Sequence, residues 1–137
     1  MYPSKEQIFS LVITFDIVLL KKIAEWKKSS WLPIRSKTKA QKQIAIVNMI
    51  DIICKHHNKP VSILLLQKNN DYAYNSKKKQ IIMGAEPSII SALHEIGHHI
   101  YGPLELNACR FSTQLFKEAF PIAYKKLKWR GHMLKKQ

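Results

Sequence analysis

The segment from residue 87 to residue 102 constrains the fold of this chain more than any other. Proline suits the first turn of a helix and glycine the position just after one, so Pro87 and Gly102 predict a helix over residues 87–101. Pro103 suits the start of another helix, which we expect over residues 103–120. The break at Gly102 and Pro103 lets the chain turn between the two helices.

The rest of the chain predicts helices on both sides of a small sheet. Ser4 suits the N-cap of a first helix, and Pro33 interrupts the connection that follows it. The order of N-terminal helices, a small antiparallel sheet and further helices is that of an α+β domain. The expected helices cover residues 4–26, 36–57 (with Ile44, Val47, Ile50 and Cys54 at helical spacing) and 122–127, and the expected strands cover residues 61–66, 72–74 and 80–83.

The size and the charge of the chain limit its class. Its 137 residues suit one domain over residues 1–137, and a hydrophobic content of 46% is enough to bury a core. The net charge of +14 is concentrated in residues 21–42 and 117–137, which sum to +7 and +6. Such basic flanks attract nucleic acid or an acidic protein; the alternative is a solvated lysine-rich surface.

The basic C-terminal segment, residues 121–137, leaves two interpretations open. It docks on a partner, with Trp129 stacking on a base, or it forms an amphipathic helix with lysines outward, which we favour.

Two features bear on the compartment. Cys54 and Cys109 are far apart in the sequence and do not suggest a disulfide framework, so a reducing compartment fits. The apolar stretch over residues 8–20 is shorter than the roughly 20 residues that a spanning helix needs. We therefore expect a buried helix in a soluble cytoplasmic protein and no membrane partner; a peripheral anchor is the alternative.

The helix over residues 87–101 carries the segment His94-Glu95-Ile96-Gly97-His98. A helix turns about 100° per residue, so His94 and His98 lie on one face, where both imidazoles reach one ion. Zn²⁺ favours nitrogen ligands, and its catalytic sites combine three protein ligands with a water. Glu95 shares an edge of that face and is placed to take a proton from the metal-bound water. This is the logic of H-E-x-x-H zinc peptidases; the alternative is a surface helix that happens to carry histidines.

Glu105 is the best candidate for a third zinc ligand, because it lies in the first turn of the next helix. An acidic residue is also favourable at a helix N-terminus by itself, which is the alternative explanation. His99 points about 100° away from His98 and is a poor partner for the same ion. Cys109 comes one turn after Glu105 and could face the site, although such a cysteine more often belongs to the core.

The two helices resemble the ImmA/IrrE group of gluzincin metallopeptidases. That family carries H-E-x-G-H on one helix and E-x-x-A-x-x-F on the next, often closing near a proline. This chain has the H-E-x-G-H pattern at residues 94–98, followed by Glu105, Ala108, Phe111 and Pro121. The resemblance implies a zincin-like fold with His94, His98 and Glu105 as ligands of one Zn²⁺ per chain and Glu95 as catalytic base.

The sequence therefore predicts a zinc metallopeptidase that hydrolyses a peptide bond in a specific protein partner, with Glu95 as general base and metal-bound water as nucleophile. We expect it in a bacterial host or encoded by a phage, with virion association as a further setting. The alternative is a basic binding or structural protein, of phage or mobile-element type, on the same scaffold and associated with nucleic acid.

Two parts of such a site stay open at this point. Residues 80–83 are either an edge strand that binds substrate by strand addition or an ordinary edge strand. The oxyanion stabiliser is one of five side chains: Tyr72, Tyr74, Tyr101, His99 and His132.

Overall fold

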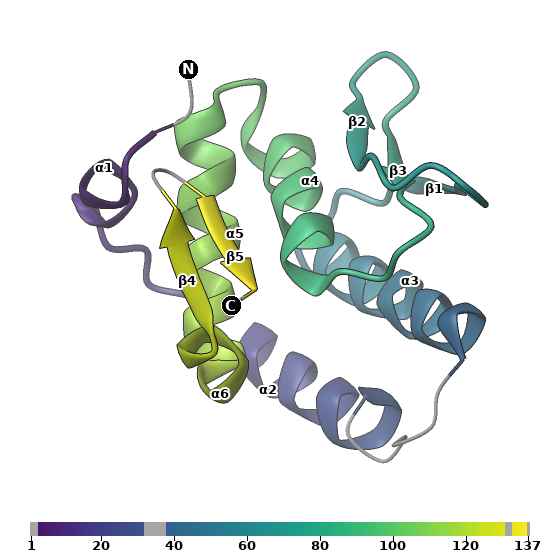
Figure 1. Cartoon of the computed structure of the whole chain (residues 1–137), viewed down its shortest axis with the longest axis horizontal. Coiled ribbons are helices and arrows are strands. Elements are labelled where there is room, and N and C mark those ends of the chain that lie inside the picture. The colour runs from purple at the N-terminus through teal and green to yellow at the C-terminus, as the bar shows by residue number, and fades with distance from the viewer. Residues whose placement is uncertain (1–2, 32–37, 131–132, 137) are drawn as a thin grey trace.

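A computed structural model of the chain describes residues 3–31, 38–130 and 133–136. These residues form an α+β domain (Figure 1). The helices are α1 (Lys5–Phe9), α2 (Ile17–Trp26) with a π-helical turn η1 (Lys27–Trp31), α3 (Lys39–His56), α4 (Ile89–Tyr101), α5 (Glu105–Ala119) and α6 (Pro121–Lys125). The strands are β1 (Ser62–Leu65), β2 (Ala73–Asn75), β3 (Gln80–Met83), β4 (Leu127–Arg130) and β5 (Met133–Lys136).

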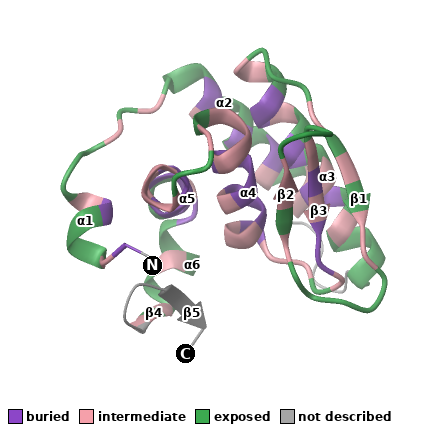
Figure 2. Cartoon of the chain, turned by 90° about the horizontal axis from the view of Figure 1, so that it is seen from above, coloured by how far each residue is buried: buried purple, intermediate pink, exposed green. Residues whose placement is uncertain are grey.

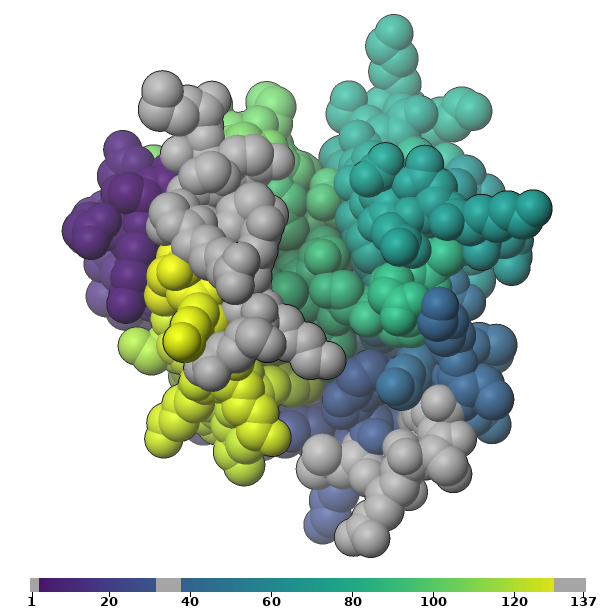
Figure 3. All heavy atoms as spheres, viewed as in Figure 1, coloured from purple at the N-terminus to yellow at the C-terminus, as the bar shows by residue number. Residues whose placement is uncertain are grey.

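Helix α4 lies at the centre of the arrangement, between α5 on one side and the three-stranded sheet on the other (Figure 1). The same order is seen from above, where buried residues gather on α4, α5 and β3 (Figure 2). On the face drawn as spheres, the atoms of α4 lie deeper than those of the sheet beside them (Figure 3). Helix α4, which carries the two histidines, therefore packs against α5 on one side and the sheet on the other.

The N-terminal helix is divided in two, and the prediction of one helix over residues 4–26 is wrong. Ser4 does cap α1 in a capping box with Gln7, but Asp16 caps a separate helix by accepting a hydrogen bond from the Val18 amide at 2.9 Å. Buried Gln114 explains the interruption. Its side chain donates to the carbonyls of Ile8 and Leu11 and accepts from the Ile13 amide, which satisfies three backbone groups that leave the helix.

Helix α3 confirms most of the predicted helix over residues 36–57. Thr38 caps its start in a capping box with Gln41, and the positive φ of 55° at Asn58 follows its end. Ile50 and Cys54 are buried as the spacing predicts, whereas Ile44 is 58% exposed. The predicted start at Ser36 and the interruption at Pro33 lie outside the described residues.

The three predicted strands form a sheet, but it is mixed rather than antiparallel. β1 pairs with β3 in parallel and β2 pairs with β3 antiparallel, which gives the order β1-β3-β2. β3 is therefore the central strand, and both interpretations of residues 80–83 as an edge strand are wrong. The sequence of β3 is consistent with its position, because Ile81 and Met83 are fully buried against the helices.

A close approach of α4 and α5 depends on Gly97. A Cβ atom at this position would lie 2.8 Å from the Cα atom of Ala108, closer than such contacts occur. The two helices approach at this point because both residues are small. Gly102, with φ of 96°, ends α4 as predicted, and Glu105 is the first residue of α5.

The C-terminal segment forms a hairpin, so the expected amphipathic helix is wrong. α6 begins at Pro121 and ends before the strand pair β4–β5, which is antiparallel with Trp129 opposite Leu134. In β4, Leu127 and Trp129 alternate with Lys128 and Arg130, a period of two that suits a strand. Within the described ranges, we find no helix long and apolar enough to cross a bilayer.

Candidate metal centre

The structure brings the three predicted ligands together. His94 and His98 lie one turn apart on α4, with their ring centroids 4.8 Å apart. The Glu105 carboxylate reaches across from the start of α5. Its Oε2 lies 3.0 Å from His94 Nε2, and its Oε1 lies 2.9 Å from His98 Nε2. Both imidazoles thus direct the same ring nitrogen toward one carboxylate.

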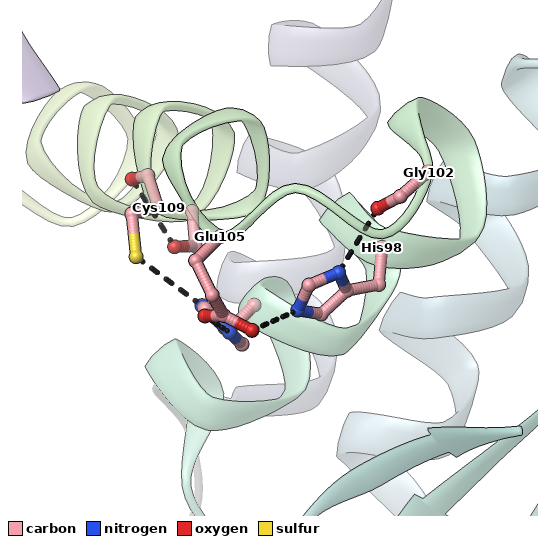
Figure 4. Close-up of polar contacts among 6 residues, drawn as sticks. His98, Gly102, Glu105 and Cys109 are labelled. Carbon is pink, nitrogen blue, oxygen red and sulfur yellow. Dashed lines mark hydrogen bonds and ion pairs between the residues drawn. The ribbon is translucent and has the colours of Figure 1, made fainter. Parts of the chain in front are cut away.

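The orientation of His98 is fixed by the end of its own helix. Its Nδ1 lies 3.0 Å from the Gly102 carbonyl (Figure 4). A carbonyl only accepts hydrogen bonds, so Nδ1 carries the proton. In a neutral ring Nε2 then presents a lone pair to a Glu105 oxygen at 2.9 Å. Two lone pairs at this distance need a cation between them, either a second proton on the ring or a metal ion.

The Nε2 atom of His94 also faces a Glu105 oxygen, and His94 is harder to protonate than an exposed histidine. Burial lowers its pKa below the ordinary value, the charge of Glu105 raises it in part, and the charge of His98 lowers it further. His94 is therefore neutral at pH 7. Its Nε2 lies 3.0 Å from Glu105 Oε2, and this buried oxygen has no well-formed hydrogen bond within the described residues.

This unpaired carboxylate oxygen is the observation that fits a metal ion. Leaving it unpaired costs free energy, and a cation on the side of the two Nε2 atoms would remove that cost. Two imidazole nitrogens and a carboxylate oxygen are a donor set that suits zinc. The side chains of His94, His98 and Glu105 are 21%, 12% and 37% exposed, so solvent reaches the site.

Cys109 also belongs to this neighbourhood, one turn after Glu105 on α5 (Figure 4). Its Sγ lies 3.8 Å from His94 Nδ1, and ligand atoms of His94, Glu105 and Cys109 all lie within 4.8 Å of one another. Burial, with the charges of Glu105 and Glu95, raises the pKa of the thiol to about 12. Without a metal ion the thiol is therefore protonated, and its Sγ is placed to accept a hydrogen bond from His94 Nδ1.

Glu95 lies next to the three ligands without joining them. It is 8% exposed, and burial is the main cause that raises the pKa of its carboxyl to about 7. The charges of His98 and Glu105 shift this pKa in opposite directions, which places Glu95 within electrostatic reach of both. Its carboxylate forms no hydrogen bond or ion pair with the described part of the chain.

The other candidate side chains are occupied elsewhere. His99 donates from Nε2 to the Lys59 carbonyl at 2.7 Å and accepts from the Tyr74 hydroxyl at 2.6 Å, so it faces the sheet rather than the ligands. The Tyr72 hydroxyl bonds backbone groups at the start of α4, and the Tyr101 ring packs on Phe111. The fifth candidate, His132, lies outside the described residues.

Two contributors to the site were missed at the level of sequence. Gly97 permits the helix contact that carries Glu105 to the histidines, and the Gly102 carbonyl orients His98. The small residue within the H-E-x-x-H segment was the available signal for the first, because a mid-helix glycine needs a packing reason.

Comparison with protein-family models, curated proteins and solved structures finds no match to this chain. The assignment of a function therefore depends on the site itself.

Proposed function

We propose that this protein is a zinc-dependent metallopeptidase of the H-E-x-x-H type, related to the ImmA/IrrE gluzincins that its two helices resemble. The observation that carries the proposal is the convergence of His94 Nε2 and His98 Nε2 on one Glu105 carboxylate, at 3.0 and 2.9 Å. A surface helix with incidental histidines has no need for an acid that faces both of them with one buried oxygen left without a hydrogen bond.

His94, His98 and Glu105 would hold one zinc ion, the usual three protein ligands of a catalytic site. When bound, zinc polarises a peptide carbonyl and lowers the pKa of a water molecule toward neutrality. The chain contributes the fixed positions of these side chains. The Gly102 carbonyl holds His98 with Nε2 toward the site, and the Gly97–Ala108 contact keeps Glu105 opposite both histidines.

Glu95 would transfer the proton of the attacking water to the leaving amine. Burial raises the pKa of its carboxyl, which makes the carboxylate a stronger base than an exposed glutamate. Its carboxylate takes a proton from the attacking water and passes that proton to the nitrogen of the leaving amine. A structural metal site has no need for a buried acid of this kind beside its ligands, which favours a catalytic site.

The substrate would be a specific protein partner, in the cytoplasm of a bacterial host or in a phage setting. This part of the proposal depends on the resemblance to ImmA/IrrE regulators. The small size of the domain agrees with a restricted rather than a general specificity.

Metal analysis of purified protein tests the proposal. We expect one zinc per chain in the wild type and in Glu95→Gln, and loss of zinc in Glu105→Ala. Glu118→Ala is the matched control, because Glu118 is an exposed glutamate on the same helix. Wild type that binds no metal after zinc is supplied would refute the metal centre. Peptide hydrolysis that survives in Glu95→Gln would refute the catalytic assignment.

A second function is favoured by one observation, the closeness of Cys109 to the ligands. If Cys109 completes a four-ligand site, the metal is structural and the chain is a basic binding protein on the same scaffold. The cobalt-substituted protein separates the two functions. A sulfur–cobalt charge-transfer absorption that disappears in Cys109→Ala supports the structural site, and its absence from wild type supports the open one.

A further inference from the structure

This chain carries more positive charge than its acidic residues can balance. The chain carries 23 lysine and arginine residues against 9 aspartate and glutamate residues. Within the described ranges, Lys39 and Lys55 are the lysines that form ion pairs, with Glu86 and Asp51. Of the other described lysines, Lys27 and Lys59 donate to backbone carbonyls, and the exposed ones among the rest can meet an external anion wherever they gather on one surface.

One such surface combines lysines with aromatic rings. Phe9 of α1 and Trp129 of β4 meet edge to face, with ring centroids 6.2 Å apart. The Lys5 ammonium lies 5.7 Å from the Trp129 ring, and the Lys117 ammonium lies 5.1 Å from the Phe9 ring and 5.7 Å from the Tyr124 ring. We call these five residues the lysine–aromatic cluster. It joins α1, the end of α5, α6 and β4, which lie on the same side of the molecule (Figure 3).

The surroundings of the cluster are strongly basic. Lys125 ends α6, Lys126 follows it and Lys128 lies within β4, and all three are exposed. The alternation along β4 places Lys128 on the face opposite Trp129, so Lys128 points away from the rings, whereas Lys125 and Lys126 follow Tyr124 directly in the chain. Glu118 is the exposed acid nearest in sequence, which leaves a clear excess of positive charge.

Half-buried rings beside lysines suit single-stranded nucleic acid. The three rings are neither fully buried nor fully exposed, and an ammonium group already lies over each. A ring face that is covered by the ammonium group of an exposed lysine can stack on a nucleobase instead, while the displaced lysine binds a neighbouring phosphate. Phosphate contacts supply affinity and stacking supplies the preference for an unpaired strand.

We propose that the lysine–aromatic cluster, with Lys125 and Lys126, is a binding surface for single-stranded nucleic acid. The surface is separate from the metal centre. Lys117 and Glu105 lie twelve positions apart on α5, or about 18 Å along the helix axis. Binding therefore does not depend on metal, and it is measured in the presence of a chelator.

The test compares two triple variants by fluorescence anisotropy with a labelled thymidine 20-mer over a range of salt concentrations. Lys117→Gln/Lys125→Gln/Lys126→Gln alters the proposed surface. Lys68→Gln/Lys77→Gln/Lys78→Gln, with the same change of charge at exposed lysines beside the sheet, is the matched control. Loss of three phosphate contacts should reduce the slope of log K against log salt by about 2 and weaken binding at least tenfold at low salt. The control variant should keep the slope of the wild type.

The same assay with an abasic 20-mer of equal charge tests the role of the rings. We expect about tenfold weaker binding than to the thymidine oligomer, because stacking is lost. Equal effects of both triple variants would overturn the proposed location. Equal affinity for the two oligomers would overturn recognition of single strands. Absence of binding at 50 mM salt, or equally salt-sensitive binding to phosphatidylserine vesicles without binding to DNA, would overturn nucleic acid as the partner.

Discussion

Replacement of Glu95 by glutamine should change how the stability of the metal-free protein depends on pH. Burial raises the pKa of this carboxyl from 4.5 to about 7 in the folded protein. A raised pKa means that the folded state binds the proton more tightly than the unfolded state. The associated stability is complete below pH 4.5 and is lost as the pH rises through 7.

The magnitude follows from the two pKa values. Each tenfold difference in proton affinity corresponds to about 1.4 kcal/mol, which gives about 3 kcal/mol for the full titration. Between pH 5 and pH 8 the expected loss is about 2.5 kcal/mol. Glu95→Gln removes the titrating group and keeps the shape of the side chain, so the variant should not show this loss. His94 titrates in both proteins, and its contribution cancels in the comparison.

The assay is urea unfolding of both proteins in a chelator at pH 5 and pH 8. The wild type should lose about 2–3 kcal/mol more than Glu95→Gln over this range, with similar m-values. A parallel pH dependence of the two proteins would refute the buried, unpaired state of Glu95. When zinc is supplied, the difference should shrink, because a nearby cation lowers the pKa of a carboxyl.

Three further substitutions test the scaffold of the site. Gly97→Ala should push α4 away from Ala108 and lower the free energy of unfolding by about 1–3 kcal/mol, partly offset by about 1 kcal/mol of helix propensity. The variant should also bind zinc more weakly. Unfolding and metal titrations equal to those of the wild type would contradict the close contact. Cys109→Ala should keep one zinc per chain but lower the zinc affinity about tenfold, because His94 Nδ1 loses its hydrogen-bond partner. A competition titration with a chelator measures the affinity. Complete loss of zinc would show that Cys109 is a ligand. Tyr72→Phe should lower the free energy of unfolding by about 1–2 kcal/mol, because the Tyr72 hydroxyl forms hydrogen bonds with two backbone groups just before α4. An unchanged urea midpoint would contradict this expectation.

The local elements follow from the sequence with few exceptions. Capping residues act within one turn, so Ser4, Gly102 and Pro121 mark helix ends or starts as local chemistry requires. β3 covers the predicted residues 80–83. The four-residue spacing of His94 and His98 places both on one face of any helix that contains them, whatever surrounds it.

The errors occur where distant residues compete with local preference. The apolar stretch near residue 13 has a composition that suits a helix. Its backbone is not helical there, because the Gln114 side chain, about a hundred residues later, forms hydrogen bonds with the backbone of Leu11 and Ile13. The parallel pairing of β1 with β3 depends on the path of the chain between the two strands, which local sequence patterns do not predict. The C-terminal hairpin gains its partner in α1, through Trp129 and Phe9.

The sequence by itself determined the side chains of the candidate site: two histidines one helical turn apart, Glu95 between them, and Glu105 after the break that ends the helix. Only the tertiary structure decided that Glu105 meets both histidines, because that requires α4 and α5 to approach at Gly97 and Ala108. It also decided the state of Glu95, whose raised pKa comes from burial by neighbours remote in the chain. Helical spacing is a property of neighbouring residues, whereas contact between helices and loss of solvent are properties of the whole packed domain.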